Sequence, residues 1–325
     1  MPALVAPDFW QKRGLASALL APAGLAYGMA GVLRRAFATP YRASVPVLCV
    51  GNLVAGGAGK TPVALSLAER FSRRGIGAHF LTRGYGGSLA GPIAVDLKRH
   101  SAAEVGDEAL LLAQSAPTWI ARDRAKGAAA ATAAGAELLL LDDGFQNPSL
   151  AKDLSLLVVD GAYGFGNRRL IPAGPLREPI RWGLARAEAA ILIGEDEAGI
   201  AVLLKNRLPL LRARIAPMET RWTGRPIVAF AGIGRPAKFF DLLRQSGAEL
   251  VAQHPFPDHH PYRSAELDAL AAEAGAAGAA LVTTAKDRVR LPVGWRDRVE
   301  VLDIAVEWED EAALDALLEK VLRHG

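Results

Sequence analysis

The chain has 325 residues, of which 51% are hydrophobic and 22% charged, with a formal net charge of +4 and a sequence pI near 9.3. This length accommodates two domains or one large α/β unit, and the apolar content excludes wholesale disorder. The mild positive charge suits an anionic ligand or a membrane surface, but no arginine-rich block indicates nucleic acid, so no nucleic-acid partner is expected. The single cysteine, Cys49, excludes an internal disulfide and indicates a reducing compartment.

An uncharged segment near the N-terminus, residues 14–33, lies between a Lys-Arg pair at 12–13 and an Arg-Arg pair at 34–35. As one helix it would be about 30 Å long, close to the thickness of a bilayer core. Three interpretations remain: a helix or helical hairpin on the membrane surface with basic flanks at anionic headgroups, a helix packed on the protein, or a span. The first is favoured because Ala and Gly dominate the segment and Pro22 interrupts it. A cleaved signal peptide is not expected, because the apolar run is too long and a basic pair closes it.

From residue 45 onward, short apolar runs alternate with helical patterns. Strands are expected at 45–50, 78–82, 118–121, 137–143, 154–160, 189–194, 226–234, 249–252, 280–284 and 299–304. Helices are expected at 61–74, 107–115, 123–134, 236–246, 264–275 and 309–323. The alternation predicts an α/β fold of the P-loop NTPase kind, with a doubly wound, mostly parallel sheet and a second, smaller α/β domain. The expected division is a membrane-associated helical segment at 1–40, a P-loop domain at 41–222 and the smaller domain at 223–325.

A glycine-rich loop, "GNLVAGGAGKTP", joins the first strand to the first helix of this pattern. The usual phosphate loop reads G-x-x-x-x-G-K-[ST], and Val54 stands where its first glycine belongs. Backbone N–H groups in a strand-to-helix turn, with the helix dipole behind them, can still cradle phosphates. The residues expected to bind a nucleotide phosphate are Gly56, Gly57, Ala58, Gly59, Lys60 and Thr61.

Two adjacent acids, Asp142 and Asp143, follow the apolar run "ELLLL". An acid at the end of a buried strand beside a phosphate loop is the usual partner of Mg²⁺ in P-loop enzymes. A pair of carboxylates there also needs a cation or hydrogen bonds to neutralise it. The sequence therefore predicts Mg²⁺ held by Thr61, Asp142 and Asp143.

Four other stretches carry polar side chains in positions that packing does not require: "VGDEALLLA" with Asp107, "LIPAGPLREP" with Arg177 and Glu178, "FPDHHPY" with His259 and His260, and "LVTTAKDRVRL" with Lys286 and Asp287. Each has a structural explanation when taken singly. An acid at a helix start complements the dipole, and histidines in a loop are often surface residues.

Taken together, the order of these motifs resembles the tetraacyldisaccharide 4′-kinases of lipid A biosynthesis. The matching stretches are "GNLVAGGAGKTP", "TRGYGG", "GDEALLLA", "DDGFQN", "IPAGPLREP", "AGIGRPAKFF", "PDHHPY" and "TTAKD", which span residues 50–288. The displaced glycine pattern is itself the family's pattern. Two positions depart from it: Asn147 replaces a histidine, and Ala285 replaces a glutamate.

The resemblance implies a kinase dependent on ATP and Mg²⁺ that phosphorylates the 4′-hydroxyl of a tetraacylated glucosamine disaccharide 1-phosphate. It implies two α/β domains with the active site between them, at the cytoplasmic face of the bacterial inner membrane, peripheral or monotopic, and without an obligate protein partner. The membrane surface would be met through the N-terminal helix.

The resemblance also implies roles for individual residues. Asp107 would act as the general base together with a histidine of the second domain, His259 or the neighbouring His260. The other residues with expected roles are Lys60 at the outer phosphates, Arg177 and Arg124 at phosphate charge, Glu178 in the Mg²⁺ shell, and Arg83 and Tyr85 on the substrate side.

Two other functions would explain only part of this pattern. A P-loop ATPase acting as a molecular switch needs no base facing a sugar, so it would leave Asp107 and the "PDHHPY" loop unexplained. A dinucleotide site at "GIGRP" would have Gly232 and Gly234 but Ala237 at the third glycine position.

Overall fold

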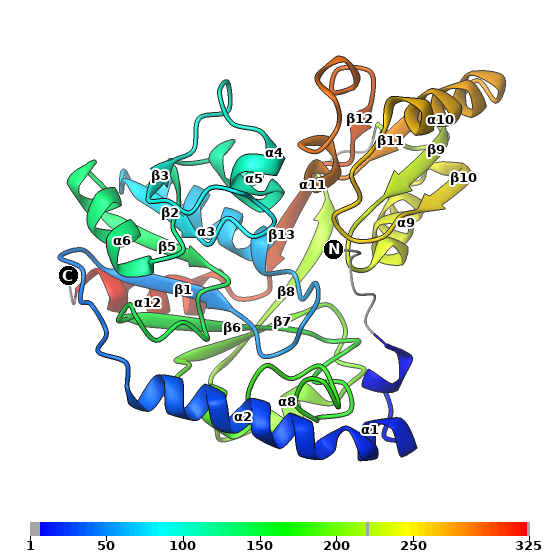
Figure 1. The fold of residues 1–325 in the computed structure, drawn as a ribbon. Helices are drawn as coiled ribbons and strands as arrows, with labels where there is room; N and C mark the ends of the chain where they lie inside the picture. The colour runs from blue at the N-terminus through cyan, green and yellow to red at the C-terminus, as the bar shows by residue number, and fades with distance from the viewer. Residues whose placement is uncertain (1–6, 219–220, 324–325) are drawn as a thin grey trace.

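The computed structural model describes residues 7–218 and 221–323 of the chain, and these form two sheets lying side by side (Figure 1). Residues 1–6, 219–220 and 324–325, which belong to the three expected segments, lie outside the described residues. The larger sheet has nine strands in the order β13-β8-β7-β6-β1-β5-β2-β4-β3. Its strands are β1 (Val47–Gly51), β2 (Ala78–Thr82), β3 (Ile93–Ala94), β4 (Thr118–Ile120), β5 (Leu138–Asp142), β6 (Leu154–Asp160), β7 (Ala189–Ile193), β8 (Leu210–Pro217) and β13 (Ile304–Trp308).

All neighbours in the larger sheet are parallel except the two edge pairs, β13 with β8 and β3 with β4. The smaller sheet has the order β10-β9-β11-β12 and is parallel throughout. Its strands are β9 (Pro226–Ala231), β10 (Glu249–Pro255), β11 (Ala280–Thr283) and β12 (Glu300–Val301). The predicted mostly parallel α/β architecture is confirmed. Parallel strands end at the same edge, so the loops after β1, β5 and β6 meet there.

Twelve α-helices connect and cover the strands within the described residues. They are α1 (Leu15–Leu19), α2 (Ala21–Ala36), α3 (Lys60–Arg73), α4 (Ala102–Val105), α5 (Asp107–Ala113), α6 (Arg124–Ala133), α7 (Ile180–Leu184), α8 (Ile200–Leu204), α9 (Pro236–Gln245), α10 (Ser264–Ala276), α11 (Ala285–Arg288) and α12 (Glu311–Leu322).

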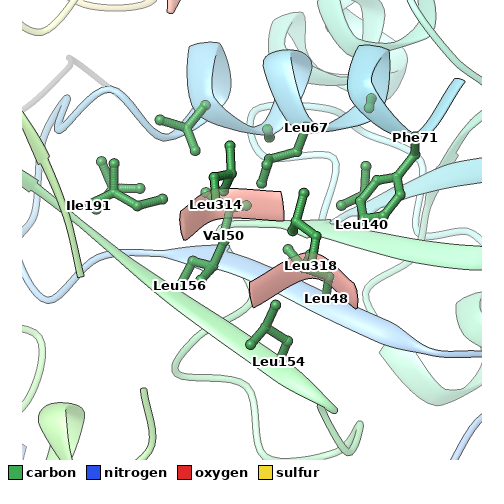
Figure 2. Packing of buried hydrophobic residues seen from close by; sticks show 14 of the residues in the cluster. Leu48, Val50, Leu67, Phe71, Leu140, Leu154, Leu156, Ile191, Leu314 and Leu318 are labelled. Atoms are coloured by element: carbon green, nitrogen blue, oxygen red, sulfur yellow. The ribbon is translucent and has the colours of Figure 1, made fainter. Parts of the chain in front are cut away.

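The core on one face of the larger sheet is formed where α3 and α12 cover its central strands (Figure 2). Leu67 and Phe71 of α3 and Leu314 and Leu318 of α12 are fully buried against residues such as Leu48 of β1. A second apolar cluster covers the opposite face of the same sheet, as expected for a doubly wound fold. The phosphate loop and α3 are therefore anchored on a rigid base.

The end of the chain differs from the expected division into domains. Strand β13 pairs antiparallel with β8 at the edge of the larger sheet, and α12 packs into the core of that sheet. Assigning all of 223–325 to the smaller domain was therefore wrong for residues 304–322. The reason is apolar burial: Leu314, Leu318 and Val321 bury their side chains against α3 and the larger sheet.

Strand β8 is not among the strands expected from the sequence. Its sequence alternates Leu211, Ala213 and Ile215 with Arg212 and Arg214, which is the period of a half-buried strand. Two arginines in five residues masked that alternation. The strand matters because β8 and β13 form the ribbon from which the smaller domain extends.

The N-terminal segment forms two helices, α1 and α2. Helix α1 ends at Leu19, and Pro22 lies in the first turn of α2, where a missing N–H is tolerated. One side of α2 packs closely on the protein: Gly24 and Gly28 are buried, and a Cβ at either would touch Leu170. Large apolar side chains of the segment are exposed, namely Leu15 and Leu19 of α1, Leu25, Met29 and Leu33 of α2, and Phe37 directly after it. Among the helices of the described residues, none is long and apolar enough to cross a membrane.

Candidate active site

The loop between β1 and α3 carries the predicted phosphate-binding residues at the start of a helix. Gly56 and Gly59 have φ angles of 110° and 86°, a backbone conformation that favours glycine. Lys60 is the first residue of α3. The N–H groups of the first helical turn and the positive end of the helix dipole therefore lie at the loop, as an anion site requires.

Val54 occupies the place of the usual first glycine because the loop is braced from outside. It is 3% exposed and forms a β-bridge with Leu176. The N–H of Ala55 donates to the carbonyl of Pro175 at 2.8 Å, and the N–H of Arg177 donates to the carbonyl of Leu53 at 2.8 Å. Residue 54 thus has an extended, paired backbone, and the turn that needs glycine begins two residues later.

The two acids after β5 have different environments. Thr61 donates its hydroxyl to Asp142 at 3.0 Å, and burial raises the pKa of Asp142 to about 7. The second oxygen of Asp142 has no hydrogen-bond partner among the described residues. Desolvation opposes ionisation of Asp143, but the charges of Lys60 and Arg177 outweigh it and lower its pKa to about 2. Asp143 is 2.7 Å from Arg177 and 3.7 Å from Lys60.

This arrangement fits a magnesium ion. A hydroxyl and two carboxylates supply oxygen ligands, and the unpaired buried oxygen of Asp142 is available to one. The described residues contain no group of three or more His, Cys, Asp or Glu side chains able to hold a metal. That finding is compatible with Mg²⁺, which is usually held by one or two carboxylates together with water and substrate phosphates.

A histidine from the smaller domain meets an aspartate from the larger one. His259 Nδ1 and Asp107 Oδ2 are 2.8 Å apart, and the side chain of Asp107 is 3% exposed against 30% for His259. Asp107 is the first residue of α5, and the ring of Tyr85 lies 5.7 Å from that of His259. Of the two adjacent histidines, His260 faces Glu266 in its own domain at 3.2 Å.

Two further cations of the smaller domain surround Asp107. Arg290 Nε is 3.6 Å from its carboxylate, and Lys286 pairs with the neighbouring Glu108 at 3.3 Å. Burial opposes ionisation of Asp107, but the hydrogen bond from His259 and the charge of Lys286 lower its pKa. Lys286 was noted in the sequence without a role, and Arg290 was missed because one arginine after "TTAKD" has no distinguishing pattern.

The predicted site residues line one cleft of about 2110 Å³, except for Asp107 and Glu178. Its lining includes the phosphate loop, Asp142, Asp143 and Arg177 on one side and Asp258 and His259 on the other. Arg83, Tyr85 and Arg124 also line it. Arg124 is 3% exposed, and burial lowers its pKa to about 10. The volume exceeds the several hundred Å³ of an ordinary ligand pocket, so the cleft has room for two ligands.

Glu178 does not line this cleft, which corrects its predicted place in the Mg²⁺ shell. Its side chain is 2% exposed and binds Arg186 through both oxygens at 2.8 Å and Arg35 at 3.2 Å. Both of its oxygens are thus taken by guanidinium groups, outside the cleft that contains the phosphate loop. Asp107 is the other exception: it is reached from the cleft through His259, which covers it.

The contact between the domains includes an ion-pair cluster that was not predicted. Asp160, at the end of β6 and 3% exposed, accepts from both Arg235 and Lys238 of the smaller domain at 2.5 Å. The loop after β9 in the smaller domain also lies close to the phosphate loop: a Cβ on Gly234 would be 3.4 Å from the N atom of Gly57. An acid directly after "LSLLVV" was the signal that could have indicated Asp160, as it indicated Asp142.

The dinucleotide interpretation of "GIGRP" is not supported by the contacts of its first glycine. The N–H of Gly232 donates to the buried carboxylate of Asp287 at 2.9 Å. A phosphate would need that N–H free, and an adjacent carboxylate repels one. Asp287 also accepts from Tyr262 at 2.7 Å, so this cluster holds the smaller domain together.

Comparison with known proteins places the chain in one family. The model of the family described as tetraacyldisaccharide-1-P 4′-kinase matches residues 16–323. The tetraacyldisaccharide 4′-kinase of Paramagnetospirillum magneticum is 57% identical over 97% of this chain and 98% of its own length, and that of Rhodospirillum centenum is 58% identical over 98% and 96%. The crystal structure of LpxK from Aquifex aeolicus in complex with ATP is similar with a TM-score of 0.76 at 26% identity, covering 94% of this chain and 99% of that one. The chain therefore belongs to the tetraacyldisaccharide 4′-kinase family, as its motifs predicted.

Proposed function

We propose that the protein transfers the γ-phosphoryl group of ATP to the 4′-hydroxyl of a tetraacylated glucosamine disaccharide 1-phosphate. Family membership and the names of relatives more than 50% identical support this activity. The observation that carries it is the pairing of Asp107 with His259, which lines the same cleft as the phosphate loop. A molecular switch has no use for a carboxylate and histidine facing a second ligand.

The test is direct. Purified protein with ATP, Mg²⁺ and the disaccharide 1-phosphate is expected to yield a bisphosphorylated product and one ADP per product. ATP hydrolysis that is unaffected by the acceptor would contradict the proposal and favour the switch.

In this reaction the acceptor oxygen forms a bond to the γ-phosphorus while the bond to the bridging oxygen of ADP breaks. We propose that the proton of the 4′-hydroxyl passes to Asp107 through His259, which lines the cleft, orients the carboxylate and relays the proton. Proton transfer is late in a loose transition state, which makes a carboxylate of lowered pKa a usable acceptor. Lys60, Arg177 and Arg124 would stabilise charge on the phosphoryl oxygens.

Magnesium would be held by Thr61, Asp142 and Asp143, and when bound it supplies positive charge at the phosphate oxygens. Glu178 is not included, because its arginine partners occupy it. The adenine of ATP would lie beside the phosphate loop against the interdomain ribbon, where Ile215 and Val306 line the cleft with Phe239 of α9. Apolar side chains next to a phosphate site suit a purine ring.

The histidine next to Asp107 is expected to matter more than its neighbour. His259→Ala should lower kcat by on the order of 10²-fold, because Asp107 loses the group that orients it. His260→Ala is the matched control and should retain kcat within about threefold, since His260 faces Glu266 in its own domain. Initial rates at saturating ATP measure both, and the reverse order would reassign the partner of Asp107.

The stability of the metal-free protein should depend on pH through Asp142. Its folded pKa of about 7 lies above the ordinary value, so the folded state holds this proton more tightly than the unfolded chain. The free energy of unfolding is therefore lowered as pH rises from about 4 through about 7. In EDTA, Asp142→Asn should raise the Tm at pH 8 and leave it nearly unchanged at pH 4, measured by thermal unfolding.

Asp143, next to Asp142, is a control for which the opposite change in Tm is expected. Its pKa is lowered to about 2, so its ionised form stabilises the fold above pH 4, and Asp143→Asn should lower the Tm at pH 8. A lower Tm for Asp142→Asn at pH 8 would contradict the expected destabilisation by the ionised carboxylate of Asp142. Both variants should also lose the Tm increase that Mg²⁺ with a non-hydrolysable ATP analogue produces in the wild type.

We further propose that the protein acts at the cytoplasmic face of the bacterial inner membrane as a peripheral or monotopic protein that binds the lipid surface through α1 and α2. The acceptor is a lipid, and the exposed apolar side of these helices is flanked by basic pairs. Leu25→Glu combined with Met29→Glu should reduce co-sedimentation with phosphatidylglycerol vesicles by about tenfold. Val293→Glu changes an equally exposed side chain of the smaller domain and should not reduce it; equal binding by all three proteins would contradict the proposal.

A further inference from the structure

The last turn of α2 contacts two loops that carry residues of the active site. Arg34 donates to the backbone carbonyl of Gln146, in the loop after β5, at 3.0 Å. Arg35 pairs with Glu178, next to Arg177, at 3.2 Å. Two consecutive arginines of the N-terminal helix therefore reach the loops that hold Asp143 and Arg177.

The carboxylate of Glu178 is the centre of this contact. It is 2% exposed and accepts from Arg186 at 2.8 Å and from the amide of Gln146 at 3.1 Å, in addition to Arg35. A buried carboxylate is destabilising when it loses a charged partner, because no water replaces it. Without Arg35, we therefore expect the carboxylate of Glu178 to move toward Arg186, its remaining charged partner, and away from Gln146.

Gln146 links Glu178 to the phosphate site. Its amide nitrogen also donates to the carbonyl of Asn52 at 2.8 Å, at the end of β1. Arg177 approaches its amide oxygen at 3.5 Å and donates to Asp143 at 2.7 Å. The contacts thus run without a gap from α2 to the arginine and aspartate beside Lys60.

The body of α2 has little freedom to absorb such a shift. Gly24 and Gly28 lie so close to Leu170 that a Cβ would come within 3.0 Å and 2.7 Å of its atoms. Leu170 in turn forms a β-bridge with Leu176, immediately before Arg177. The helix is thus packed against the same loop that its arginines contact.

We infer that Arg35 is a positioning residue for phosphoryl transfer: through Glu178 it holds Gln146, and Gln146 holds Arg177 against Asp143. The inference rests on the proposed roles of Arg177 and Asp143. It makes α2 part of the catalytic architecture, in addition to its proposed contact with the membrane.

The test compares Arg35→Met with wild type, using acceptor dispersed in detergent so that vesicle binding does not limit the rate. Loss of an orienting partner of this kind is expected to lower kcat by about tenfold. The KM for ATP should stay within about twofold, because the phosphate loop itself is unchanged. Arg35→Lys should restore most of kcat, because its ammonium group still neutralises Glu178.

Arg42→Met is the matched control: Arg42 also pairs with a carboxylate, Asp153, at 3.1 Å, but Asp153 accepts from the N–H of Val47, whereas Glu178 accepts from Gln146. It should retain wild-type kcat. Wild-type kcat for Arg35→Met, or an equal loss for both arginine variants, would overturn the inference.

A general loss of structure is distinguished by the background of Glu178→Gln, whose amide needs no cation. In that background, Arg35→Met should cause no further loss of kcat, because Arg35 acts through Glu178. The same loss in both backgrounds would overturn the inference, as it would show an independent structural effect. Arg177→Met distinguishes failure of the proposed role of Arg177 from failure of the inference about Arg35. Full activity of Arg177→Met would refute the proposed role of Arg177. An inactive Arg177→Met beside a fully active Arg35→Met would refute only the inference.

Discussion

Replacement of Asp107 with alanine is expected to lower kcat for phosphoryl transfer by about 10²-fold to 10⁴-fold. The reason is that the acceptor hydroxyl must lose its proton, and Asp107 is the buried carboxylate that the smaller domain covers with His259 at 2.8 Å. The substitution also leaves Arg290 and Lys286 without the charge they face. Rates of product formation at saturating ATP and acceptor give the measurement.

The control for Asp107→Ala is Asp268→Ala, which removes an exposed acid on α10 and should leave kcat unchanged. Binding of ATP should also be retained by Asp107→Ala, because the residue lies outside the phosphate loop. Near-normal turnover of Asp107→Ala would contradict its assignment as the base.

The second large effect is expected for Lys60→Ala, which should lower kcat by about 10²-fold to 10³-fold and weaken ATP binding. Lys60 opens α3 at the phosphate loop, and its ammonium group is 3.7 Å from Asp143. Without it, Asp143 faces the nucleotide phosphates with only Arg177 to neutralise it. Isothermal titration with a non-hydrolysable ATP analogue and steady-state kinetics measure the two effects.

Lys205→Ala is a suitable control for Lys60→Ala, since it removes an exposed lysine at the end of α8. Its affinity and kcat should match the wild type. Unchanged ATP affinity and turnover in Lys60→Ala would mean that the loop does not bind the transferred phosphate.

The two domains together explain why transfer to water would be slow. In the proposed mechanism the base Asp107 is surrounded by His259, Lys286 and Arg290 of the smaller domain, whereas the phosphate loop belongs to the larger one. Chemistry therefore requires the domains to stay in contact, and the ion pairs of Asp160 with Arg235 and Lys238 hold that contact beside the loop. Closure of this kind excludes water from the site.

Local patterns were enough for the parts of the protein that are built from neighbouring residues. The strand, glycine loop and amphipathic helix around Lys60 have periodicities and turn residues that indicate their structure directly. The same holds for Asp142 after its buried strand. The motif order identified the family, although Val54 departs from the usual phosphate loop.

What only the tertiary structure decided depends on contacts between distant segments. His259 and Asp107 are 152 positions apart, and nothing local distinguishes His259 from His260 until the smaller domain is oriented. Glu178 looked like a metal ligand, but Arg35 and Arg186 reach it first. Strand β13 and α12 return to the larger sheet because that sheet still has an apolar face to cover. The periodicity of a sequence indicates which face of a helix or strand is buried. Which distant residue a side chain contacts depends on packing across the whole fold.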